Sequence, residues 1–436
     1  MPRDRRAAAL AALLGAWGCG ESERPALLSD RVGVAVEGCE QFSYEICDIR
    51  EAKCQRELFG LMACLRGEDV TAAGPPPVSV MTEELAAARV LEGVDRSTDA
   101  EAAADFEAEV RGLEMLGLLE PGLIGNADDV LDVTIQSVAA YYKPSTKEVV
   151  IIDRGDPLDD LSSNSTLAHE FVHALQDRRW DLGTFGSDAR ASSDQSLAIT
   201  SVVEGEATLY ELLLNIAYQG VALDQANYAA AFESMVGYGE ELSMNMGSAI
   251  MSASSVFPYT YGARFMGQHW LSGRTPELES VFAQPPASSL EVMSAGSLAS
   301  APVLEAFDVL PAPLDGHRFV ADDVAGAWVT LSRLLELAGS TARVEFLRSV
   351  ATRWRGDRFW LYQSQDDALL ASSAIWWTSW ADEDAAKAFR DQVLLFRPAG
   401  AAIQVQTVGT RTRVVVTERP EELADWGVRA DDALLE

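Results

Sequence analysis

Two of the four histidines in the chain lie four residues apart, at His169 and His173, and Glu170 directly follows the first of them. On a helix, residues i and i+4 share one face, so both imidazoles can reach a single metal ion. Glu170 is rotated by about 100° around that helix, beside the metal position and within reach of a water molecule there. This spacing is typical of zinc hydrolases. The competing interpretation is a chance match on an ordinary buried helix.

The segment 162–177 is predicted to be a helix independently of this motif. Asn164 or Ser165 can serve as its N-cap. Asp177, one turn after His173, can orient that imidazole from behind or can simply end the helix. An apolar stripe lies away from the histidines and should face the core, and it comprises Leu167, Ala168, Phe171, Val172 and Leu175.

A catalytic zinc ion usually takes three protein ligands and a water molecule, so the two histidines need a further partner. The other histidines, His269 and His317, are isolated in the sequence. The segment 201–211 is predicted to be a helix and carries two glutamates. Glu204 is the candidate third ligand, and Glu206, which should point roughly away from it, is the alternative.

Two β-rich runs precede the motif helix, 138–142 and 148–152, and the turn-forming segment 143–147 joins them. They predict a β-hairpin next to the histidines. One of its strands is a candidate sheet edge that holds an extended peptide by strand addition. The alternative is a hairpin that contributes only to the core.

The motif and the downstream glutamate resemble the gluzincins, metallopeptidases in which a glutamate on a later helix completes a His-Glu-x-x-His site. Val203–Ala207 is similar to the Asn-Glu-Gly-x-Ala ligand segment of their aminopeptidase branch. The resemblance implies that Glu204 binds zinc in a thermolysin-like fold. The spacing from His173 to Glu204 is longer than in the aminopeptidases, so the chain is not a close member of that branch.

A second segment, Tyr259–Ala263, is similar to the Tyr-x-x-Gly-Ala segment of the same gluzincins. The resemblance implies that Tyr259 stabilises the oxyanion that forms during amide hydrolysis. Tyr261 and His269 are alternatives for this role, and Tyr259 can also be a buried structural residue.

The longer box His169–Asp177 looks like that of a set of largely uncharacterised bacterial envelope proteins, which carry His-Glu-x-x-His-Ala-Leu-Gln-Asp. Further similar segments place the resemblance over roughly residues 78–436, and they are Ala140–Pro144, Trp180–Leu182, Phe257–Gly262 and Trp354–Phe359.

The fold class expected from these patterns is α+β. The resemblance implies a thermolysin-like zincin core with a small sheet, the motif helix and the glutamate-bearing helix. The predicted organisation is a signal peptide at 1–19, a cysteine-containing helical hairpin at 20–66, a proline-rich linker at 67–77, this core at 78–312, and a helical and α+β region at 313–436. Strands in the last region are predicted near 359–362, 374–378, 403–408 and 412–416, with helices near 324–337, 342–354, 382–395 and 421–426.

The N-terminus has a basic start, a short apolar stretch at 7–17 and then Cys19. This order resembles a bacterial lipoprotein signal, in which Cys19 becomes lipid-anchored and the chain is exported to the cell envelope. The alternative is a plain secretory signal that is cleaved nearby.

Four of the five cysteines remain once Cys19 is set aside. If their segment folds as a helical hairpin that turns near 48–53, the pairs Cys39–Cys64 and Cys47–Cys54 lie opposite each other. Disulfides suit an exported chain. A four-cysteine metal site is the alternative.

The chain has a formal net charge of −33. Binding to nucleic acid requires a basic face, so nucleic acid is not an expected partner. The expected partners are a zinc ion, a peptide or protein substrate, and a membrane reached through the lipid on Cys19.

The expected activity is zinc-dependent hydrolysis of peptide bonds, with Glu170 as the general base and Tyr259 at the oxyanion. A catalytically silent zinc-binding envelope protein that acts as a binding or scaffolding module is the alternative. A third possibility is a latent peptidase whose cleft is covered by the cysteine hairpin or by the C-terminal region.

Overall fold

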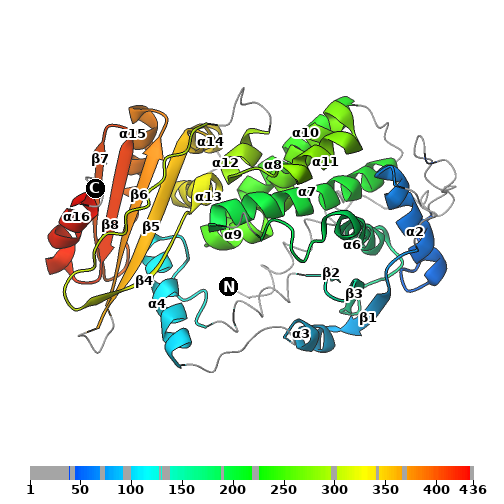
Figure 1. Ribbon diagram of the computed structural model, residues 1–436, viewed down its shortest axis with the longest axis horizontal. Coiled ribbons are helices and arrows are strands. Elements are labelled where there is room, and N and C mark those ends of the chain that lie inside the picture. The colour runs from blue at the N-terminus through cyan, green and yellow to red at the C-terminus, as the bar shows by residue number, and fades with distance from the viewer. Residues whose placement is uncertain are drawn as a thin grey trace.

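The computed structural model describes residue 39 and residues 45–68, 74–91, 100–126, 129, 138–187, 191–218, 225–295, 302–339, 343–365 and 371–432. This part of the chain is a mixed α+β protein, as predicted. Figure 1 shows its two sheets at opposite ends of the molecule with helices between them. The predicted signal peptide with Cys19 lies outside the described residues.

The smaller sheet has three strands in the order β1–β3–β2. β1 (Val78–Thr82) pairs in parallel with β3 (Glu148–Asp153), and β2 (Ala140–Lys143) pairs with β3 in antiparallel orientation. The predicted hairpin is therefore confirmed, and β2 is an edge strand. Ile152 donates its backbone N–H to Ala139. Because pairs alternate along an antiparallel ladder, Tyr142 turns its backbone groups outward from β3.

The motif helix α6 (Leu161–Trp180) begins earlier than predicted. Asp160 is its N-cap: its side chain accepts the backbone N–H of Ser163, and the Ser163 hydroxyl binds the backbone N–H of Asp160. This reciprocal capping box stabilises the first turn, so the prediction of Asn164 or Ser165 as N-cap is wrong. Both side chains are buried and bind other parts of the chain instead.

The long helix α7 (Ser193–Tyr218) packs against α6 and carries the downstream glutamates. The π-helical turn η2 (Pro258–Gly262) and α10 (Ala263–Gly273) pack against α7 from another side. Other helices of this central layer are α8 (Gln225–Met246), α9 (Ala249–Ser255), α11 (Thr275–Ala283), α12 (Ser289–Ser294), α13 (Gly326–Ala338) and α14 (Val344–Ala351). None of the described helices is long and apolar enough to cross a membrane.

The larger sheet is antiparallel with the order β4–β5–β6–β8–β7. Its strands are β4 (His317–Asp323), β5 (Trp354–Ser364), β6 (Ser372–Trp380), β7 (Ala402–Val408) and β8 (Arg411–Thr417). The sequence does not predict β4, since it is a half-exposed edge strand with only a short apolar run. Trp376 packs on Phe389 of α15 (Glu383–Val393) on one face. On the other face, Tyr362 packs on Trp426 of α16 (Leu423–Asp432), which follows the short 3-10 turn Pro420–Glu422.

Side chains from both sides of the predicted boundary at residue 312 share one hydrophobic cluster. Phe257 and Trp328, for example, lie with their ring centroids 5.0 Å apart. The helix α4 (Ala100–Leu116) crosses the same boundary in space, because it packs against β5 and β6 (Figure 1). The parts of the chain before and after residue 312 are therefore packed together. The domain boundaries remain predictions.

The N-terminal cysteines form the two predicted disulfides, Cys39–Cys64 and Cys47–Cys54. One arm of the predicted helical hairpin is present as α2 (Ala52–Leu65). The other arm is not helical at residues 45–48, the part of it that the structure describes next to Cys47. α2 packs on α6, where Phe59 meets Phe171 edge-to-face. Helix α3 (Glu83–Leu91) follows directly on β1.

Candidate metal centre

Three side chains from α6 and α7 converge on one point: His169, His173 and Glu204. The Oε2 atom of Glu204 lies 3.2 Å from Nε2 of His169 and 3.3 Å from Nε2 of His173. One ligand atom from each residue lies within 4.8 Å of the other two. Two imidazole nitrogens and a carboxylate oxygen in this arrangement could hold a metal ion.

The ring nitrogens on the far side of the two histidines are also held. Nδ1 of His173 lies 2.8 Å from Oε1 of Gln176, and Nδ1 of His169 lies 3.3 Å from Oε2 of Glu211. The second contact is close, but it is not aligned as a hydrogen bond, which leaves both of its buried atoms without a hydrogen-bond partner. The Gln176 oxygen keeps the proton of His173 on Nδ1 and leaves its Nε2 lone pair free, as a metal-binding histidine requires. The Glu211 carboxylate lies on the corresponding side of His169.

The electrostatics of the cluster favour a cation between these side chains. Burial opposes charge on His169, but the nearby carboxylates of Glu204 and Glu211 outweigh it and raise the pKa of His169 well above its usual range. Burial also opposes charge on Glu204, yet the two histidines outweigh it and hold the pKa of Glu204 well below its usual range. The carboxylate therefore stays ionised at neutral pH and can pair with a protonated imidazole or with a metal ion.

Glu170 lies beside this cluster, and its carboxylate is buried. Burial raises the pKa of Glu170, while the neighbouring histidines lower it. The backbone N–H of Tyr142, which points outward from the edge strand β2, donates a hydrogen bond to this carboxylate. The edge strand, the carboxylate and the metal cluster thus lie next to one another.

Tyr259 approaches the cluster from η2. Its ring stacks on that of His169 with 6.1 Å between centroids, and its hydroxyl is hydrogen-bonded to Glu204. Burial and the nearby carboxylates raise the pKa of Tyr259 well above its usual range, so the hydroxyl keeps its proton and remains a donor. Of the three candidates for the oxyanion role, Tyr259 is the one beside the cluster.

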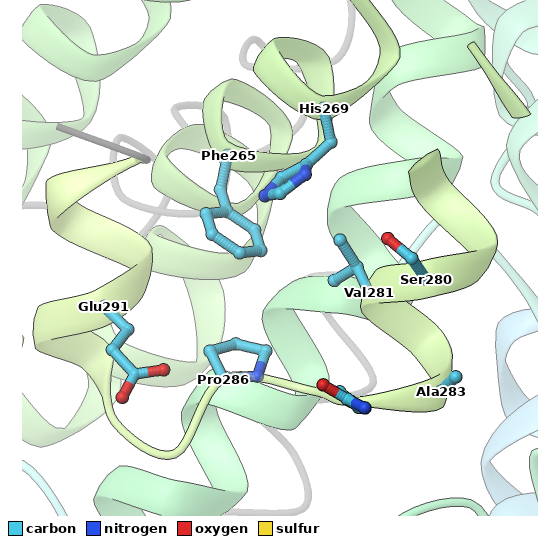
Figure 2. A pocket seen from close by; sticks show the side chains of 8 residues that line it. Phe265, His269, Ser280, Val281, Ala283, Pro286 and Glu291 are labelled. Carbon is cyan, nitrogen blue, oxygen red and sulfur yellow. The ribbon is translucent and has the colours of Figure 1, made fainter. Parts of the chain in front are cut away.

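The two alternatives lie elsewhere. Tyr261 is fully buried and donates its hydroxyl to Glu240 at 2.6 Å. Figure 2 shows His269 beside Phe265, pointing into a pocket between α10 and α11. None of the residues that line this pocket belongs to the metal cluster.

A close approach of two backbones places Glu204 and Tyr259 in their relative positions. Gly205 of α7 faces Gly262 of η2, and a Cβ atom at Gly262 would lie 2.6 Å from the backbone oxygen of Ser201. A Cβ atom at Gly205 would collide with the backbone of Gly262. Only glycine allows helices to approach this closely.

Glu206, the alternative third ligand, points away from the cluster. Its carboxylate pairs with the buried Arg66 at 3.1 Å and accepts a hydrogen bond from Gln176 at 2.9 Å. Asp177 does not reach His173 either, because it binds the hydroxyl of Tyr142 and the ammonium of Lys147, each at 2.6 Å. It ties the β2–β3 hairpin to the end of α6.

Three residues around the cluster were not expected from the sequence: Gln176, Glu211 and Arg66. Gln176 follows His173 by three residues, and Glu211 follows Glu204 by seven, so helical spacing places each on the face of its ligand. That spacing is a signal that could have identified them. Arg66 has no such local signal, because it is 140 residues from Glu206 in the sequence.

We compared the chain with protein-family models, with curated proteins and with solved structures, and none of the three comparisons found a match. The geometry of the cluster is therefore the basis for assigning it a function.

Proposed function

We propose that this protein is a zinc-dependent metallopeptidase of the gluzincin type, with a thermolysin-like arrangement around its metal. The observation that carries the proposal is the convergence of His169, His173 and Glu204 with a carboxylate and a phenol beside them. A metal site alone would need only the first three residues. The additional acid–base group and hydroxyl donor are the groups that amide hydrolysis requires.

Histidine nitrogens and a carboxylate oxygen suit zinc, and the hydrogen bond at Nδ1 of His173 leaves the Nε2 atom of that residue for it. Zn²⁺ bound there would act as a Lewis acid, which acidifies water and polarises a carbonyl group. These ligands would come from two adjacent helices, α6 and α7, which pack directly against each other.

Glu170 accepts a proton from the attacking water while the water oxygen bonds to the peptide carbonyl carbon. The same carboxyl group then gives that proton to the leaving amine as the C–N bond breaks. Tyr259 donates its hydroxyl to the carbonyl oxygen, which carries negative charge in the tetrahedral state. Its raised pKa suits this role, because a phenolate could not donate.

The edge strand β2 supports a peptide as the substrate. Its outward backbone N–H at Tyr142 already reaches Glu170, so an extended chain along β2 would pass beside that carboxylate. Strand addition is a common means of holding a peptide in an extended conformation.

The substitution Glu170→Gln tests the proposal. It keeps the shape of the side chain and the three metal ligands, so bound zinc, measured by elemental analysis, should stay at the wild-type ratio. Cleavage of a peptide library should fall by about 10²–10⁴-fold, the usual contribution of a general base. The matched control is Glu291→Gln, in the His269 pocket, which should cleave at the wild-type rate.

Wild-type cleavage by Glu170→Gln would contradict the proposed mechanism. A wild-type protein that binds zinc and cleaves no peptide in the library would instead favour the binding or scaffolding module. A chelator control separates metal-dependent cleavage from contaminating peptidases.

A further inference from the structure

Arg66 is a buried cation that the proposed chemistry does not use. It directly follows α2 and is 3% exposed, and its guanidinium contacts both carboxylate oxygens of Glu206, at 3.1 and 3.2 Å. A second partner is Glu68. Burying a charge is costly even when it is paired, so an apolar residue would fill this position at lower cost. The buried ion pair of Arg66 and Glu206 is therefore expected to have a role beyond stability.

Glu206 in turn holds the side-chain amide of Gln176. The Nε2 group of Gln176 donates to the Glu206 carboxylate at 2.9 Å and to the backbone oxygen of Val203 at 2.8 Å. Both partners are acceptors only, so the nitrogen of the amide must face them. The amide oxygen then faces Nδ1 of His173 at 2.8 Å.

This orientation selects one form of the imidazole. An amide oxygen can only accept, so His173 must carry its proton on Nδ1. The Nε2 lone pair is then directed at Glu204, 3.3 Å away, where a metal ion would bind. The opposite tautomer, with its proton on Nε2, has no lone pair for a metal at that position.

We propose that Arg66 is a positioning residue for the metal site, acting through Glu206 and Gln176 to hold His173 in its metal-binding tautomer. The proposal rests on the metal-binding part of the proposed function and is independent of hydrolysis. Without the guanidinium, the buried carboxylate of Glu206 loses its counter-ion and its fixed orientation. Gln176 is then free to turn its amide around and present N–H to His173.

The proposal makes the disulfide-linked N-terminal segment part of the metal site. The Cys39–Cys64 disulfide ends two residues before Arg66. Near the N-terminal end of α6, the side-chain amide of Asn164 donates a hydrogen bond to the backbone oxygen of Cys47 at 2.8 Å. Near the C-terminal end of that helix, Arg178 lies over the ring of Phe59 of α2, so the segment contacts the motif helix near both of its ends.

The test is the zinc affinity of the full-length protein, measured by competition with a chromophoric chelator. Arg66→Met should weaken zinc binding by about 10–100-fold, the usual effect of removing a residue that orients a ligand. Arg66→Lys should recover part of the loss, since it keeps the charge and lacks the two-pronged geometry. The matched control is Arg178→Met: Arg178 lies over the ring of Phe59 at the same α2–α6 interface, 4.8 Å from its centroid, and should leave the affinity unchanged.

A double-mutant cycle with Gln176→Met separates positioning from general loosening of the fold. If Arg66 acts through Gln176, Arg66→Met should have little further effect in the Gln176→Met background. Additive losses would overturn the proposal. So would wild-type zinc affinity in folded Gln176→Met, a result that also decides the matter should Arg66→Met fail to fold.

The failure of this proposal and the failure of the proposed function have different signatures. If the wild-type protein binds zinc and Arg66→Met binds it equally well, only the role of Arg66 is overturned. If the wild-type protein binds no zinc, the metal site itself is overturned, and the positioning role falls with it.

Discussion

The helix α7 contributes carboxylates to two clusters with very different surroundings. In the middle of the helix, Glu204 meets the imidazoles of His169 and His173. At its first turn, Asp194 accepts both the backbone N–H and the hydroxyl of Ser289. Asp194 therefore has hydrogen-bond donors directed at it, whereas around Glu204 the possible metal-binding atoms converge on one point.

Asp357, a neighbour of Asp194, is likewise surrounded by hydrogen-bond donors. Asp357 accepts the backbone N–H groups of Ala325 and Gly326 at 3.1 and 3.0 Å, and the indole N–H of Trp376 at 2.7 Å. It thereby satisfies the orphan donors at the start of α13. Burial raises the pKa of Asp194 to about 7 and that of Asp357 to about 6. A shifted pKa thus marks both clusters, and only the converging ligand atoms distinguish a site from a cap.

The largest difference between the two clusters should appear when the carboxylate of Glu204 is removed. Glu204→Gln replaces an anionic ligand by a neutral amide, so we expect zinc binding to be lost at micromolar zinc. Isothermal titration calorimetry on the metal-free protein measures it directly.

The paired control for that experiment is Glu206→Gln, which leaves all three ligands in place. It should weaken zinc binding by about 100-fold at most, the effect of an orienting residue. If Glu206→Gln abolished binding while Glu204→Gln retained it, the assignment of the third ligand would be reversed.

A smaller effect is expected from the hydroxyl beside the cluster. Tyr259→Phe removes the proposed oxyanion donor, so kcat for peptide cleavage should fall by about 10²–10³-fold. Zinc affinity should stay within a few fold of wild type. Tyr261→Phe is the matched control, because its hydroxyl binds Glu240 instead; a loss of kcat in this variant alone would assign the donor role to Tyr261.

The smallest effect concerns the other cluster, and it is one of stability. Between about pH 4 and pH 7 the unfolded chain has lost the Asp194 proton while the folded protein keeps it, so this group makes stability fall as pH rises. Asp194→Asn should remove up to about 1.4 kcal/mol per pH unit of that slope. Urea unfolding at pH 5 and pH 8 measures it, with the exposed Asp391→Asn as control; equal slopes in wild type and Asp194→Asn would show that the slope does not arise from the buried Asp194 carboxyl.

Much of the local structure around the site could be predicted from the sequence, because its signals are local. Helical spacing places His169 and His173 on one face, and β-rich runs around a turn form the β2–β3 hairpin. Both disulfide pairs are those expected from a hairpin that turns near residues 48–53. The N-cap of α6 was wrong because two buried polar residues, Asn164 and Ser165, look like capping residues in sequence.

The remaining features depend on contacts between distant segments. No periodicity connects Arg66 with Glu206, and no local pattern tells that Tyr261 turns to Glu240 while Tyr259 turns to His169. The position of α4 on the C-terminal sheet is of the same kind. Such pairings are decided by the packing of whole elements, which a single sequence does not reveal.

The contact between Gly205 and Gly262 has a consequence for how this protein can diversify. Because the two backbones touch there, Glu204 and Tyr259 form one rigid frame and cannot be adjusted independently. The β2–β3 hairpin is attached to the neighbouring helix α6 instead, through side-chain contacts such as the hydrogen bond from Tyr142 to Asp177. In the proposed peptidase, changes in substrate preference should therefore accumulate in the hairpin while the frame stays constant, so the hairpin is the natural target for directed evolution of a new specificity.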